Sequence, residues 1–119
     1  MSARAIETLG RRLGPLFVIA AMLALTASAA RADTVKLSIT IKDQKFDPAE
    51  LHAPPGQTIE IAVKNLNPIV SEFESADLHF EKIVPAGSQG VVYVRPLQPG
   101  RYNFYDDFHH ATQGTLVVP

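Results

Sequence analysis

Alternation of apolar and polar residues organises most of this chain. Apolar residues occupy every second position in two long stretches, residues 34–42 and 57–65. A period of two is that of a half-buried β-strand, which turns one face to the core and the other to solvent. The positions that this alternation assigns to the core are Val35, Leu37, Ile39, Ile41, Ile59, Ile61 and Val63.

Shorter extended segments follow, and turn residues rich in Asn, Pro and Gly separate them. A segment from residue 43 to residue 56 is predicted to be a turn and a loop. Six or seven short strands with turn signals roughly every 8–12 residues are typical of a β-sandwich. We therefore predict a single all-β domain of about seven strands. The further strands expected are 72–75, 80–84, 90–95, 100–105 and 115–118.

The first 32 residues have the features of a secretory signal peptide. Arginines precede an unbroken apolar run over residues 16–25, and small residues lead to an Ala-Arg-Ala cleavage site at 30–32. The run is shorter than the roughly 20 residues that span a membrane, so a retained anchor is the less favoured alternative. We expect residues 1–32 to be removed and residues 33–119 to reach the periplasm, with no membrane insertion after cleavage.

Removal of this leader changes the charge and the available chemistry. The leader contains four of the 11 basic residues and one of the 12 acidic residues, which leaves seven basic and eleven acidic residues, a net charge of −4. The absence of a basic patch argues against nucleic acid as a partner. The chain has no cysteine, and both methionines lie in the leader, so the exported domain has no sulfur ligand.

The most concentrated candidates for chemistry follow the strand that begins at Gly100. Tyr102 and Phe104 alternate with polar residues, and the same period of two places Asp106 on their apolar face. A carboxylate there is costly unless a cation or hydrogen-bond donors offset its desolvation. The imidazole of His109 comes three residues later. We therefore predict that Asp106 and His109 form the nucleus of a metal site.

Three glutamates offer further carboxylates, Glu72 and Glu74 on one predicted strand and Glu81 on the next. We expect Glu72, together with Glu74 or Glu81, to complete the metal site. Glu72 and Glu74 share a face opposite Phe73, so a regular strand with Phe73 in the core would point both away from the interior. A bulge before Glu72 would re-aim them, and the sequence leaves both alternatives open.

Each of these residues also has an ordinary structural interpretation. Acids on edge strands are usually solvated, and an Asp after an aromatic strand often starts a turn. Their concentration in two segments of a small domain favours the metal site. Asp107 lies on the face opposite Asp106 by strand parity, so we expect it to matter less. No nucleophile motif and no Gly-rich phosphate loop is present, so catalytic residues are not assigned.

Three longer patterns resemble those of cupredoxins. They are Pro-x-Gly followed by apolar alternation and Asn over residues 54–65, Pro-Gly-x-Tyr-x-Phe-Tyr with a later His over 99–109, and Gly-Thr-Leu-x-Val over 114–118. The resemblance covers nearly the whole of the exported domain. It implies that the β-sandwich has a Greek-key, cupredoxin-like topology.

The resemblance also locates the positions of the blue-copper ligands. Asp106 stands at the cysteine position, His109 at that of the loop histidine and Thr112 at that of the axial methionine. The first histidine position falls near Ser71 or Glu72. Without a thiolate, this chain cannot form the His₂Cys centre of a blue-copper protein.

Within the cupredoxins, the chain is most similar to the cupredoxin-like domain of periplasmic iron-uptake systems, which accompanies high-affinity iron permeases. The segments responsible are 72–75, 81–82 and 106–109. The resemblance implies an iron ion, a copper ion or both as cofactor, and a role in binding or oxidising Fe(II) before a membrane permease and its periplasmic partners take it up. The alternatives are a non-catalytic metal carrier and a structural sandwich that only binds partners; whether the protein is an enzyme stays open.

Overall fold

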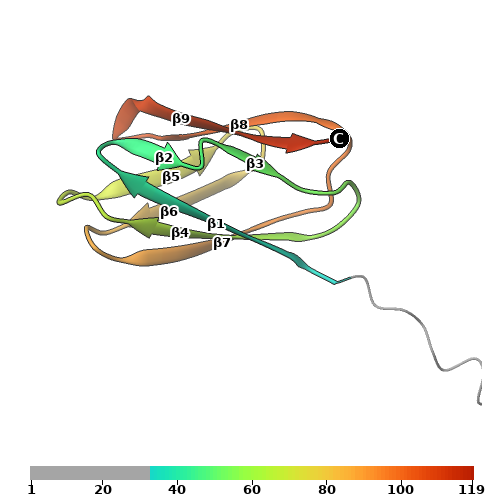
Figure 1. Cartoon of the computed structure of the whole chain (residues 1–119), viewed down its shortest axis with the longest axis horizontal. Helices are drawn as coiled ribbons and strands as arrows, with labels where there is room; N and C mark the ends of the chain where they lie inside the picture. The colour runs from blue at the N-terminus through green and yellow to red at the C-terminus, as the bar shows by residue number, and fades with distance from the viewer. Residues whose placement is uncertain (1–32) are drawn as a thin grey trace, which may run out of the picture. The chain divides into compact units, whose positions relative to one another are not determined.

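The structure, a computed structural model, describes residues 33–119, so the predicted leader lies outside the described residues (Figure 1). The described part contains nine strands and no helix. It accordingly holds no helix of the length and apolarity needed to cross a membrane. The strands are β1 Val35–Lys42, β2 Lys45–Asp47, β3 Glu50–His52, β4 Ile59–Asn65, β5 Ser71–Ser75, β6 Phe80–Val84, β7 Gln89–Val94, β8 Gly100–Asp106 and β9 His109–Val118.

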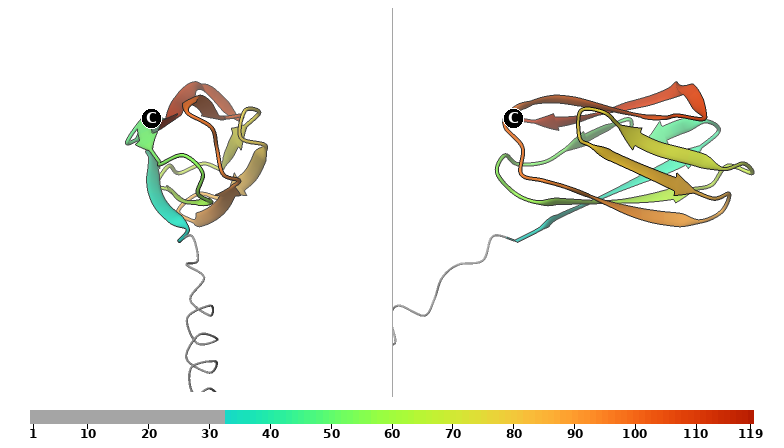
Figure 2. Two further views of the ribbon diagram at one scale, coloured as in Figure 1. Left: turned by 90° about the vertical axis from the view of Figure 1, so that its right-hand side faces the viewer. Right: turned by 180° about the vertical axis from the view of Figure 1, so that it is seen from behind.

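The strands form two sheets that pack face to face, with the core between them (Figures 1 and 2). One sheet has the order β2-β1-β4-β7 and the other has the order β3-β9-β8-β5-β6. Both sheets are mixed, because β1 runs parallel to β4 and β3 runs parallel to β9. The all-β sandwich predicted from the alternation is confirmed.

Two strands lie in the segment that the sequence predicted to be a turn and a loop. β2 pairs with β1 through Phe46 opposite Ile41, and β3 pairs with β9 through Leu51 beside Leu116. Each strand has three residues and buries one apolar side chain. Three residues are too few to show a period of two, so pairing with longer neighbours decides these strands.

The last strand is longer than predicted, because it begins at His109 rather than near Thr115. β8 and β9 form a hairpin in which Asp106 pairs with His109, so only Asp107 and Phe108 make the turn. The register shifts between Tyr105, which pairs with Gln113, and Asp106, which pairs with His109, so the extra residues 110–112 lie in β9. The tight turn places Asp106, at the end of β8, beside His109, at the start of β9.

Aromatic rings fill the centre of the core. The ring of Phe73 lies 4.7 Å from that of Phe80, 5.4 Å from that of Phe104 and 5.7 Å from that of Phe46, measured between centroids. Gly114 lies opposite Phe104 on β9, where a Cβ atom would come within 2.2 Å of the Phe104 ring. The core therefore places Phe73 inward, which determines where its neighbours on β5 point.

Candidate metal centre

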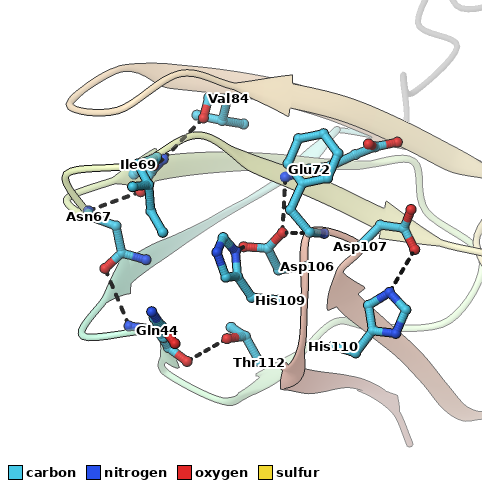
Figure 3. Close-up of polar contacts among 12 residues, drawn as sticks. Gln44, Asn67, Ile69, Glu72, Val84, Asp106, Asp107, His109, His110 and Thr112 are labelled. Atoms are coloured by element: carbon cyan, nitrogen blue, oxygen red, sulfur yellow. Dashed lines mark hydrogen bonds and ion pairs between the residues drawn. The ribbon is translucent and has the colours of Figure 1, made fainter.

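The side chain of Asp106 points into the sandwich, as strand parity predicted, and is fully buried. Its Oδ1 accepts hydrogen bonds from the backbone N–H groups of Glu72 and Phe108, each at 3.0 Å. Its Oδ2 lies 3.1 Å from Nδ1 of His109 (Figure 3). The desolvation of this carboxylate is thus offset by protein donors.

These hydrogen bonds join two parts of the chain that are far apart in sequence. Asp106 binds the backbone of β5 at Glu72 and the β8–β9 turn at Phe108. A further bond, from the N–H of Asp107 to the carbonyl of Glu72 at 2.9 Å, closes the link. The start of β5 and the β8–β9 turn are therefore held side by side at one end of the sandwich (Figure 1).

A second group of acids lies on the outer face of the same sheet. Carboxylate oxygens of Glu72, Glu74 and Asp107 lie within 4.8 Å of one another. Glu74 also stands directly opposite Glu81 in the β5–β6 pair, and Glu81 acts on the pKa of Glu72. We call Glu72, Glu74, Glu81 and Asp107 the outer carboxylate cluster.

The acids of this cluster raise one another's pKa. The pKa of Glu72 rises from 4.5 to about 7, first because its side chain shares a hydrogen bond with Glu81, then through burial and the charges of Glu81, Asp107 and Glu74. The pKa of Glu74 is also raised, by burial and by Asp107 and Glu81. Burial raises the pKa of Tyr105, with smaller contributions from the charges of Glu74, Asp107, Asp77 and Glu81. The cluster therefore retains a proton near neutral pH, which a cation can displace.

Histidine side chains flank the two groups of acids on opposite sides of the turn. His109 pairs with the buried Asp106, whereas Nε2 of the exposed His110 lies 3.4 Å from Oδ1 of Asp107 (Figure 3). His110 thus places an imidazole nitrogen beside the cluster. The charge of His110 acts against the increase in the pKa of Glu74.

The structure separates the five predicted metal ligands into two groups. Glu72, Glu74 and Glu81 gather on the outer face, while Asp106 and His109 pair on the inner side. β5 pairs with β6 without a register shift, so the glutamates keep the outward direction of a regular strand. Metal binding by any of the five stays a prediction.

Sequence reasoning gave little weight to Asp107, the residue that the structure adds to the glutamates. The signal that would have found it is the same strand parity: Glu72, Glu74 and Asp107 all lie opposite inward residues. What was missing was the pairing of β5 with β8, in which Phe73 lies beside Asp106.

The positions that correspond to blue-copper ligands do not form a copper–thiolate site. Besides Asp106 and His109 they include Ser71 and Thr112, both buried. The hydroxyl of Thr112 donates to the carbonyl of Gln44, and that of Ser71 has no hydrogen-bond partner within residues 33–119. None of these positions supplies the thiolate that a blue-copper centre requires.

Comparison with known proteins agrees with this fold. The family model described as Cupredoxin-like domain matches residues 15–118. The chain belongs to the cupredoxin-like domain family. It is also 40% identical, over 85 residues, to the uncharacterized protein RP394 of Rickettsia prowazekii (strain Madrid E), a match that covers 71% of this chain and 68% of that protein.

Solved structures with the same fold include proteins that bind copper. The metal-binding domain of the Cu(I)-exporting P-type ATPase CopA of Streptococcus pneumoniae D39, in its Cu(I) form, superposes with a TM-score of 0.63 at 17% identity, covering 76% of this chain and 99% of that one. Auracyanin of Roseiflexus castenholzii gives 0.59 at 19% identity, with coverage of 75% and 99%. The Cu(I) form of an amicyanin variant gives 0.57 at 17% identity, with coverage of 79% and 88%. At these identities the likeness establishes the fold, which is related to that of copper-binding proteins.

Proposed function

We propose that this cupredoxin-like protein binds a hard metal cation, iron foremost, at the outer carboxylate cluster. The observation that supports the proposal is the approach of the carboxylates of Glu72, Glu74 and Asp107 to within 4.8 Å of one another. Like charges repel at this distance, so a cation or a proton must accompany them. Glu72, whose pKa is about 7, binds that proton when no cation is present.

The donor set decides which cations suit the cluster. Carboxylate oxygens favour hard ions, and neither sulfur nor a pair of imidazoles is at hand to select Cu(I). Fe(III) gains more than Fe(II) from anionic ligands, because the attraction grows with the charge of the ion. Cu(II) is the second candidate, since Nε2 of His110 lies beside Asp107 and provides one nitrogen ligand.

The proposed biological role is in iron uptake in the periplasm, before a membrane permease takes up the ion. Three features support it: the predicted signal peptide, the oxygen-rich cluster, and the resemblance of segments 72–75, 81–82 and 106–109 to iron-uptake cupredoxins. A site that favours Fe(III) also assists the oxidation of Fe(II), with dioxygen as the electron acceptor. A carrier would bind the same ion without this oxidation.

Calorimetric titration of the purified protein tests the site. Glu74→Gln and Asp107→Asn should each weaken binding of Fe(III), offered as its citrate complex, and of Cu(II) by about tenfold or more. Glu60→Gln is the matched control, because it removes one carboxylate from the other sheet and should leave both affinities unchanged. Equal affinities in all four proteins would reject the site.

Oxygen consumption separates an oxidase role from a carrier role. Purified protein is mixed with Fe(II) in air, with and without Cu(II), and compared with Asp107→Asn. Faster consumption that Asp107→Asn abolishes supports assisted oxidation, whereas binding without faster consumption supports a carrier.

Export is tested separately. N-terminal sequencing of the protein from the periplasmic fraction should begin at Asp33, and a full-length protein in the membrane fraction would contradict export.

A further inference from the structure

Asp106 differs from the acids of the outer cluster in both direction and partners. We propose that Asp106 is a positioning residue: its buried carboxylate holds Glu72 and Asp107 together so that the outer cluster forms, and it is not itself a metal ligand. This inference rests on the proposed function, since it concerns how that site is assembled. It departs from the sequence prediction that Asp106 is the nucleus of the metal site.

The direction of the side chain is the first argument. Asp106 stands beside Phe73 in the β5–β8 pair, and both are fully buried. Glu72 and Glu74 flank Phe73 along β5 and therefore point to the opposite face. The backbone of the sheet thus separates the carboxylate of Asp106 from those of the outer cluster.

The hydrogen bonds of Asp106 are the second argument. Oδ1 accepts from two backbone N–H groups at 3.0 Å, and Oδ2 lies 3.1 Å from His109 Nδ1. Both oxygens are therefore occupied by protein donors when His109 holds its proton on Nδ1. A carboxylate in this state has little left to offer a metal ion, and it gains charge-assisted hydrogen bonds instead.

The identity of the donors is the third argument. One bonded N–H belongs to Glu72 itself, and the other belongs to Phe108, the neighbour of Asp107. The N–H of Asp107 in turn donates to the carbonyl of Glu72 at 2.9 Å. These three bonds hold the backbones of Glu72 and Asp107 together where β5 meets the β8–β9 turn.

This support is needed because the cluster opposes its own formation. The charges of Glu72 and Asp107 repel, and the charge of Asp107 helps to raise the pKa of Glu72. Glu74 pairs with Glu81 on one side and Tyr105 on the other, whereas the strand pairing of Glu72 is with Ile83 of β6. Loss of the Asp106 bonds should therefore move Glu72 and Asp107 apart and leave Glu74 in place.

Two substitutions at this position distinguish positioning from ligation. Asp106→Asn keeps an oxygen that accepts both N–H bonds, and its amide nitrogen donates to His109 after a change of tautomer. Asp106→Ala removes the hydrogen bonds of the side chain to the N–H groups of Glu72 and Phe108 and to His109. A positioning role predicts that Asp106→Asn binds Cu(II) within about fivefold of the wild type, because only a distant charge is lost. Asp106→Ala should weaken binding by about tenfold or more, as Asp107→Asn does.

The affinities are measured by calorimetry on the purified protein, together with amide hydrogen exchange without metal. In Asp106→Ala the amides of Glu72 and Phe108 should exchange faster, and in Asp106→Asn they should stay protected. A loss in Asp106→Asn as large as in Asp107→Asn overturns the proposal in favour of ligation. Wild-type affinity in a folded Asp106→Ala overturns it in favour of a role in the fold alone.

If Asp106→Ala does not fold, Asp106→Asn and its amide exchange still decide between positioning and ligation. Failure of the proposed function has a different pattern. In that case Glu74→Gln and Asp107→Asn bind metal as well as the wild type does, whatever happens at position 106.

Discussion

Asp106 and Asp107 are neighbours in the chain and opposites in the structure. Asp106 is fully buried, and N–H groups from two segments surround its carboxylate. Asp107 is partly exposed and faces the carboxylates of Glu72 and Glu74. A buried carboxylate that protein hydrogen-bond donors stabilise contributes to the fold. A carboxylate surrounded by other carboxylates keeps a charge that a bound cation can neutralise.

The outer faces of the two sheets differ in the same way. On the β1–β4 pair, Lys36 is beside Glu60, so unlike charges are neighbours. On the β5–β6 pair, Glu74 faces Glu81 directly. Like charges opposite each other destabilise a sheet, so the second arrangement is a cost to the metal-free protein that a bound cation would remove.

Removal of the Asp106 carboxylate should have the strongest effect on stability. Asp106→Ala leaves the N–H groups of Glu72 and Phe108 without their acceptor, and each such loss costs about 1–3 kcal/mol. The free energy of unfolding in urea, with chelator present, should fall by about 2–5 kcal/mol. Asp107→Ala should leave the stability unchanged or raise it, because it removes repulsion. A larger loss in Asp107→Ala than in Asp106→Ala would contradict the assignment of their roles.

An intermediate effect concerns pH. Unfolding lowers the pKa of Glu72 from about 7 to 4.5, so between these values the native protein binds more protons than the unfolded chain. The contribution of Glu72 to stability is thus complete below pH 4.5 and is lost as pH rises to about 7. Melts of the metal-free protein between pH 5 and pH 8 (roughly this window) should show a falling midpoint that Glu72→Gln flattens.

The proton bound by Glu72 should be released when the metal binds. Cu(II) must displace it, so affinity should increase as pH rises toward about 7 and change less above that value. Titrations across this range, with proton release measured from buffers of different ionisation enthalpy, test the expectation. An affinity independent of pH would show that Glu72 is not a ligand.

A weaker effect is expected from Glu81, within the outer carboxylate cluster. The hydrogen bond to Glu81 is the leading cause of the raised pKa of Glu72. Glu81→Gln removes a charge, so the pKa of Glu72 should move back toward 4.5 and metal should bind at lower pH. Carbon-detected NMR titration of the Glu72 carboxyl measures the shift. Glu60→Gln on the other sheet should leave that titration unaltered.

Much of the fold follows from residue pattern alone, since the alternation in residues 34–42 and 57–65 predicted both long strands and their core faces. The inward direction of Asp106 and the shared face of Glu72 and Glu74 also follow from the period of two, because side chains alternate on any regular strand. The strands β2 and β3 could not be predicted in this way. Each buries one residue, and only pairing with β1 or β9 makes it a strand.

The site depended on tertiary structure for a different reason. Strand parity predicts which way the side chains of Asp106 and Asp107 point, but it does not predict which groups from other strands surround them. Only the pairing of β5 with β8 brings the N–H group of Glu72 to the buried Asp106, whereas the N–H of Phe108 is local, two residues further along the chain. The same pairing brings Asp107 to Glu72 and Glu74. A buried carboxylate needs either hydrogen-bond donors or a cation. The sequence alone does not show which of these a distant strand will bring to it.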